Sequence, residues 1–257
     1  MLYAPIDSGG IRGNVTFLSE ANSESAKISV YLTSLLEGTQ LFDWAIHEFP
    51  VFFDLKNPCQ ATELGKSIAD LTRHHGQLKL ASGEMQVFEF ESTAIQLSGL
   101  QTIWGRSLYL KSTNTSARAC SNVMETGKTT TAIARFTQTV AGIILLRENE
   151  RAETIIFSNL YYASDRSGSR NDWSIMVTDV LDRNTDFECN DVQILLDPDN
   201  VDDSQCSSTE HRHCKMGDLT HKHGQLLVGK DNNRYSKKFS VDRNLPLEYV
   251  ESSRKLF

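Results

Sequence analysis

The sequence predicts an all-β protein made of two tandem copies of one β-sandwich or barrel unit. Short runs of β-branched and alternating residues recur at regular intervals, with turn-forming glycine, asparagine and serine between them. One block of residues also occurs twice along the chain. Helical periodicity extends nowhere beyond about two turns. Together these features favour strands over helices throughout.

Six runs carry the strand signal. They are short, and they are either rich in β-branched side chains or alternate apolar with polar residues, as half-buried strands do. The runs are residues 14–18, 27–32, 86–90 and 106–110 in the first copy, and residues 142–146 and 154–157 in the second. The last two correspond to the first two, so both copies begin with the same pair of strands.

The repeated block is a nonapeptide. Residues 70–78 (DLTRHHGQL) recur as residues 218–226 (DLTHKHGQL), and seven of the nine positions are identical. Upstream, Trp44 of the first copy corresponds to Trp173 of the second. Landmarks that recur in the same order indicate a duplicated unit rather than a chance match.

The second copy carries an insertion. Cys59 precedes its nonapeptide by 11 residues and Cys189 precedes its copy by 29, so the second copy is longer by 18 residues here. The inserted segment is polar and acidic around residues 197–204, which is typical of a surface loop. The copies join near residue 128, and we expect domains over residues 10–127 and 132–257.

Composition restricts the class of protein. The chain has 257 residues, of which 39% are hydrophobic, enough to build packed cores. The net charge of −7 argues against a nucleic-acid partner. No apolar run reaches the roughly 18 residues that a membrane helix needs. No signal peptide is visible in this chain, so a secreted protein would have to begin upstream of it.

The cysteines and two glycosylation sequons favour an oxidising, extracellular compartment. The chain has five cysteines, none in a CxxC pair, and sequons at Asn14 and Asn114. Cys206 and Cys214 lie close together in the one long insertion. We therefore predict a disulfide between them that pins this loop.

Four segments point to a family. They are residues 47–49 after Trp44, residues 105–108 (GRSL), residues 117–120 (ARAC) and residues 216–219 (MGDL). In this order they resemble the copper–zinc superoxide dismutases, most closely the tandem copper-only superoxide-dismutase-repeat proteins. The resemblance implies two Greek-key β-sandwich or barrel domains. It also implies that the second domain lacks its last strand, because the chain stops before that strand's position.

The resemblance also assigns copper-ligand positions, and few of them hold histidine. In the first copy His47 is retained, Ala45 and Lys111 replace two ligands, and the bridging histidine has no counterpart. The corresponding positions of the second copy hold non-histidine residues, namely Ser174, Met176 and Leu195. At the zinc site Lys215 replaces a histidine. The retained acids, Asp70 and Asp218, are interpreted as caps of their own backbone turns.

The same resemblance pairs Cys59 with Cys120 in a disulfide. It leaves Cys189 as a free thiol, because the matching cysteine would fall beyond Phe257. The family's catalytic arginine position holds Ala117, and Arg118 comes one residue late. On a strand, a shift of one residue turns a side chain to the other face.

The remaining histidines offer an alternative metal site. In the pairs His211/His213 and His221/His223 the spacing would place both rings on one face of a strand, as a weak zinc or copper site requires. The competing interpretation of His47 and His223 is structural: each would be a hydrogen-bonded histidine of the sandwich. No resident cofactor is expected; copper remains the open candidate and zinc is disfavoured.

The sequence thus predicts a superoxide-dismutase-like repeat protein that acts as a non-catalytic structural or binding module. The alternative is a copper-dependent superoxide dismutase with an unorthodox ligand set. A third hypothesis is a metal-storage or chaperone module that uses the paired histidines. The expected partners are further repeats of the same parent protein or another protein.

Overall fold

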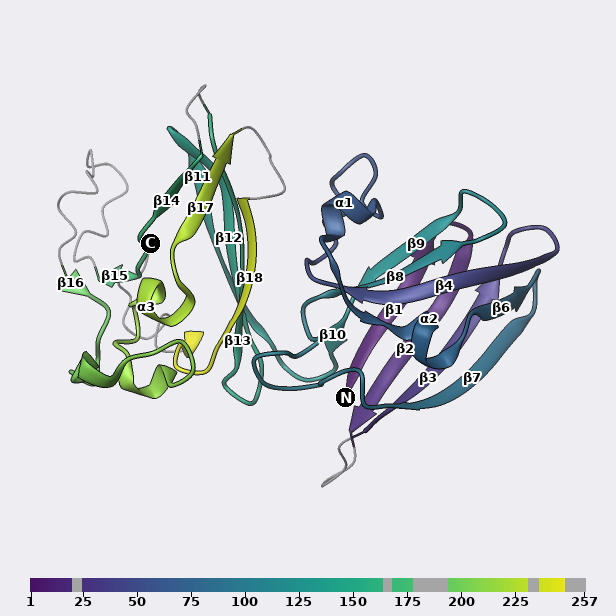
Figure 1. The fold of residues 1–257 in the computed structure, drawn as a ribbon, viewed down its shortest axis with the longest axis horizontal. Helices are drawn as coiled ribbons and strands as arrows, with labels where there is room; N and C mark the ends of the chain where they lie inside the picture. Colours follow the sequence, from purple (N-terminus) through teal and green to yellow (C-terminus); the bar gives the residue numbers. More distant parts are fainter. Residues whose placement is uncertain (20–24, 164–167, 178–193, 231–235, 248–257) are drawn as a thin grey trace. The chain divides into compact units, whose positions relative to one another are not determined.

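The computed structural model describes residues 1–19, 25–163, 168–177, 194–230 and 236–247. The chain divides into two compact units, Met1–Thr126 and Gly127–Phe257, which we call unit 1 and unit 2 (Figure 1). In the described residues both units consist mainly of antiparallel strands, with a few helices of three to five residues. The expected all-β class is confirmed.

The first sheet of unit 1 has the strand order β10-β1-β2-β3-β7. Its strands are β1 (Leu2–Ser8), β2 (Ile11–Ser19), β3 (Ala26–Ser34), β7 (Met85–Ser92) and β10 (Met124–Glu125). Alternate residues of β3 point inward: Ile28, Val30 and Leu32 are fully buried. This alternation is the pattern by which the sequence predicted the strand.

The second sheet of unit 1 has the order β5-β4-β8-β9, with β6 also paired to β4. Its strands are β4 (Thr39–His47), β5 (Ser67–Asp70), β6 (Leu78–Ala81), β8 (Ser107–Ser112) and β9 (Arg118–Asn122). Two short helices, α1 (Ala61–Leu64) and α2 (Leu71–His75), precede β5 and β6. The chain crosses between the sheets after β3, β6, β7 and β9, so that both contribute buried side chains such as Val30 and Trp44 to the unit.

Unit 2 repeats the first sheet with the order β11-β12-β13 and with β18 paired to β13. These strands are β11 (Thr130–Thr137), β12 (Val140–Glu148), β13 (Thr154–Tyr162) and β18 (Lys237–Asp242). The parallel between β3–β7 and β13–β18 is close: Ala26 pairs with Ser92, and Thr154 pairs with Asp242.

The rest of unit 2 consists of short elements. They are β14 (Ser169–Asn171), β15 (Met176–Val177), β16 (Ile194–Leu195), β17 (Leu226–Lys230), η2 (Asp203–Gln205), η3 (His211–His213) and α3 (Leu219–His223). A core of Leu146, Ile156, Leu196, Met216 and Leu219 lies between these elements and the sheet. In the part of unit 2 that is described, β18 is the last strand.

One expectation about secondary structure is wrong. The pairs His211/His213 and His221/His223 lie in η3 and α3, not in strands, so neither pair presents its two rings side by side on a sheet face. The reason is local: Asp218 caps α3, which makes its first turn helical, and hydrogen bonds of i to i+3 spacing wind η3.

Both predicted disulfides are present. Cys59 is bonded to Cys120 across unit 1, and Cys206 is bonded to Cys214 within the inserted segment of unit 2. Cys189, which was expected to be a free thiol, lies outside the described residues. Among the described residues, no helix is both long and apolar enough to cross a bilayer.

Candidate functional sites in the two units

The repeated nonapeptide builds the same brace in each unit. In unit 1 the Trp44 backbone N–H donates to Thr72 Oγ1 (2.6 Å), Thr72 Oγ1 donates to the Trp44 carbonyl (3.1 Å), and the indole N–H donates to Gly76 O (2.9 Å). In unit 2 Trp173 and Thr220 make the corresponding bonds at 2.7 and 3.0 Å, and the indole donates to Gly224 O at 2.8 Å. The repeat is therefore explained by hydrogen bonds between the side chains of these residues and the backbone.

The two retained acids have capping roles. Asp70 accepts a hydrogen bond from the Arg73 backbone N–H, and Asp218 accepts one from His221, each at 3.0 Å. Asp218 also lies 2.5 Å from His221 Nδ1. Both carboxylates thus serve the first turn of a short helix, which is the role expected from their place at a turn.

A cavity of about 290 Å³ lies on one face of the second sheet of unit 1. It is where the family resemblance would place copper. Its lining residues come from β4, β5, β8 and the start of α2, and the charged or imidazole-bearing ones are Asp43, His47, Asp70 and Lys111. In this cavity His47 is the one imidazole, and the lining also includes Ala45 and Lys111, two residues that the family resemblance assigned to copper-ligand positions.

His47 is held in place by one hydrogen bond and one ring contact. Its Nδ1–H donates to the Gly65 carbonyl at 2.9 Å, and its ring stands edge-on against Tyr109 with centroids 5.1 Å apart. Burial lowers the pKa of His47, and the bond to Gly65 opposes this shift only in part. Burial thus favours the neutral form of this imidazole.

Arg118 lies on the same face of the sheet as Lys111, because the two residues pair directly across β8 and β9. The pairing continues from here to Tyr109 and Cys120 without a break, so Arg118 and Cys120 share that face. The prediction that Arg118 faces away from the family's arginine position at residue 117 stays a prediction.

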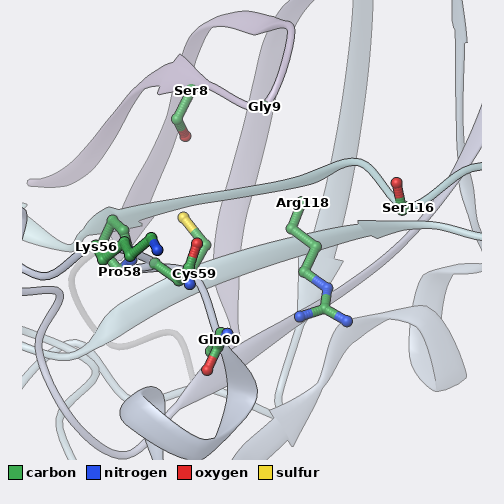
Figure 2. A pocket seen from close by; sticks show the side chains of 9 residues that line it. Ser8, Gly9, Lys56, Pro58, Cys59, Gln60, Ser116 and Arg118 are labelled. Atoms are coloured by element: carbon green, nitrogen blue, oxygen red, sulfur yellow. The ribbon is translucent and has the colours of Figure 1, made fainter.

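A second pocket, of about 490 Å³, lies beside the Cys59–Cys120 disulfide (Figure 2). It is lined by Ser8, Gly9, Lys56, Asn57, Pro58, Cys59, Gln60, Ser116 and Arg118. Figure 2 shows the Arg118 side chain reaching into the space beside Cys59 and Gln60. The pocket thus carries two cationic side chains, and its floor is an oxidised sulfur pair that cannot ligate a metal as thiolate.

A cluster of charged and titratable side chains lies inside unit 2, around Asp242, whose side chain is fully buried. Asp242 Oδ2 accepts from Lys222 Nζ (2.7 Å) and from His223 Nε2 (2.9 Å). Asp242 Oδ1 accepts from the Asn244 backbone N–H at 2.7 Å and lies 3.7 Å from His211 Nδ1. Three segments distant in the sequence therefore meet at one carboxylate.

The electrostatics of this cluster follow from its burial. Burial by itself raises the pKa of Asp242, but the neighbouring histidines and Lys222 outweigh it and keep the carboxyl ionised. Burial lowers the pKa of Lys222 and of His223, and the charge of Asp242 opposes both shifts. A single buried anion thus compensates several potential cations.

The histidines of each pair separate. His211 and His223 face each other across the cluster, with ring centroids 4.9 Å apart. His221 instead contacts the capping residue Asp218 and is exposed at the surface. His213 does not belong to the cluster. The sequence analysis did not predict a role for Asp242. The one sequence feature that could have indicated it is the acidic residue at the end of β18, where the corresponding strand of unit 1, β7, ends in Ser92.

Comparison with known proteins gives a limited result. No protein-family model matches the sequence. No curated protein matches it. Among solved structures, superoxide dismutase 5 of Candida albicans is similar: a variant form is 23% identical, covering 49% of this chain and 92% of its own, with a TM-score of 0.38. The Cu(II) form is 24% identical, covering 49% and 94%, with a TM-score of 0.37. Similarity at this level concerns the fold alone.

Proposed function

We propose that this chain is a non-catalytic superoxide-dismutase-like repeat protein that serves as a structural or binding module. The observation that carries the proposal is the number of imidazoles in the cavity at the expected copper position. His47 is the one imidazole there, and because its Nδ1–H donates to the Gly65 carbonyl it could offer a metal Nε2 alone. One imidazole cannot replace the nitrogen-rich ligand set that holds Cu(II).

The neighbouring positions work against copper. Ala45 offers no ligand atom, and the ammonium of Lys111 would repel the ion. In unit 2, Met176 pairs with Leu195 across β15 and β16, so two further ligand positions hold one thioether and one alkyl side chain. Neither unit, in its described residues, supplies the four imidazoles at these positions.

The structural features of the two units, in contrast, are present in both. The two disulfides and the two matched tryptophan–threonine braces preserve the framework of each unit. We infer that the units are tandem repeats used for their surfaces, in an extracellular setting where disulfides persist. The partners would be further repeats of the parent protein or another protein.

The deciding experiment measures copper content and dismutase activity of the full chain after Cu(II) loading, dialysis and chelation. We expect copper below stoichiometry and activity that chelation removes. His47→Ala should leave both unchanged. His211→Gln is assayed in parallel, so that the buried cluster of unit 2 cannot act as a second copper site.

The opposite result would support the alternative, a copper-dependent superoxide dismutase with an unorthodox ligand set. It would consist of near-stoichiometric copper with an imidazole EPR pattern and chelation-resistant activity. That activity would also have to disappear in His47→Ala and persist in His211→Gln.

A further inference from the structure

We propose that His211, His223 and Asp242 form a divalent transition-metal site, suited to Zn(II), that fastens the inserted segment of unit 2 to its sheet. The ligand atoms of these three residues lie within 4.8 Å of one another. They come from three elements: His211 from η3 in the insertion, His223 from α3 in the nonapeptide, and Asp242 from the end of β18.

His211 provides the clearest support for a metal ligand in this cluster. The residue is 6% exposed, and its Nδ1 has no hydrogen-bond partner although it is buried. Its Nε2 lies 3.0 Å from the Ser208 carbonyl and must donate to it. In neutral His211 the Nδ1 lone pair therefore faces Asp242 Oδ1 at 3.7 Å, two acceptors with nothing between them. A cation at this point satisfies both atoms.

The surroundings resemble those of a metal-binding histidine. Such histidines usually donate their second ring N–H to a backbone carbonyl or carboxylate, which fixes the tautomer that ligates the metal. The bond from His211 to Ser208 has this arrangement. Asp242 is likewise oriented by the Asn244 N–H, and Asn244 Nδ2 donates to the carbonyls of His211 (3.2 Å) and Cys214 (3.1 Å).

Zinc requires only a small adjustment of these groups. Typical Zn–N and Zn–O bonds of about 2.0–2.2 Å place tetrahedral ligand atoms roughly 3.3 Å apart. The His223 Nε2 to Asp242 Oδ2 separation is already 2.9 Å, and the His211 Nδ1 to Asp242 Oδ1 separation is 3.7 Å. On binding, His223 would exchange its hydrogen bond to Asp242 for the metal, and its ring proton would move to Nδ1.

The positive charge of Lys222 repels a metal ion and is expected to weaken zinc binding. Its ammonium lies 2.7 Å from Asp242 Oδ2 and also donates to the Met216 carbonyl at 2.7 Å. A divalent ion must therefore bind beside a buried positive charge. We expect zinc to bind less tightly than in sites of closed Cys/His type, and Lys222→Met to tighten it.

The site is specific to unit 2. In unit 1 the matching histidine, His75, packs against Trp44 and Phe90, and Ser92 occupies the position of Asp242. Unit 1 also lacks the inserted segment that delivers His211. The site would therefore hold the inserted segment in place, together with the Cys206–Cys214 disulfide in the same segment.

The test uses zinc chloride with the metal-stripped full chain and measures binding by equilibrium dialysis with elemental analysis. Each histidine pair provides a matched control: His211→Gln and His223→Gln remove ligands, whereas His213→Gln and His221→Gln remove their neighbours. We expect stoichiometric zinc in the wild type and in both controls. Affinity should fall by roughly tenfold or more in each ligand variant.

A second readout separates ligation from folding. Cobalt(II) in the wild type should give the d–d absorption of a tetrahedral or five-coordinate site, and this spectrum should disappear in His211→Gln while far-UV circular dichroism is retained. No zinc retention by the wild type, or equal retention by all four variants, would overturn the proposal. Neither result bears on copper in unit 1, so failure here is distinct from failure of the proposed function.

Discussion

Removal of the Cys59–Cys120 disulfide should lower the free energy of unfolding of unit 1 substantially. The bond joins residues 61 apart in the sequence. By the chain-entropy estimate, closing such a loop in the unfolded state contributes about 4 kcal/mol. Cys120 is 1% exposed and packs with Val51, Leu64 and Tyr109, so replacing both cysteines by alanine adds roughly 1 kcal/mol of lost packing.

The Cys206–Cys214 disulfide is the internal control, because its residues are only 8 apart. The same estimate gives it about 2.5 kcal/mol. We would measure urea unfolding of the wild type and of the two double-alanine variants by tryptophan fluorescence. If removing the Cys59–Cys120 bond cost no more than removing the Cys206–Cys214 bond, the loop-length reasoning would be refuted.

Two further predictions concern the braces and His47. Thr72→Val and Thr220→Val each strip the partner from a tryptophan backbone N–H, and each should destabilise its own unit by about 1–3 kcal/mol in urea unfolding; an effect in one unit only would contradict their equivalence. Because burial lowers the pKa of His47, folding favours its neutral form, so its contribution to stability is present above the ordinary histidine pKa of 6.5 and is lost as pH falls below it. Unfolding titrations from about pH 7 to 5 should therefore show a steeper acid loss in the wild type than in His47→Gln, and equal slopes would argue against a neutral His47.

Local sequence accounts for most of the fold. The six alternating or β-branched runs fall in β2, β3, β7, β8, β12 and β13. The Cys206–Cys214 bond followed from closeness in one loop, and the Cys59–Cys120 bond followed from the family resemblance. The strands and the Cys206–Cys214 bond depend on side-chain alternation and short-range spacing, which are visible in a single chain.

The candidate sites were less predictable. The histidine pairs were expected on strands, but Asp218 caps a helical turn and separates the two rings of its pair. The error came from applying the alternation of a strand to a segment that forms a short helix.

Sequence patterns alone were enough to predict the strands and the capping acids. The meeting of His211 and His223, from different pairs, at Asp242 became visible only in the folded chain. It depends on β18 pairing with β13, which brings Asp242 to the histidines of α3 and η3. Alternation along a strand is a local consequence of backbone geometry, whereas a buried cluster of charges exists only once distant segments have packed and excluded water.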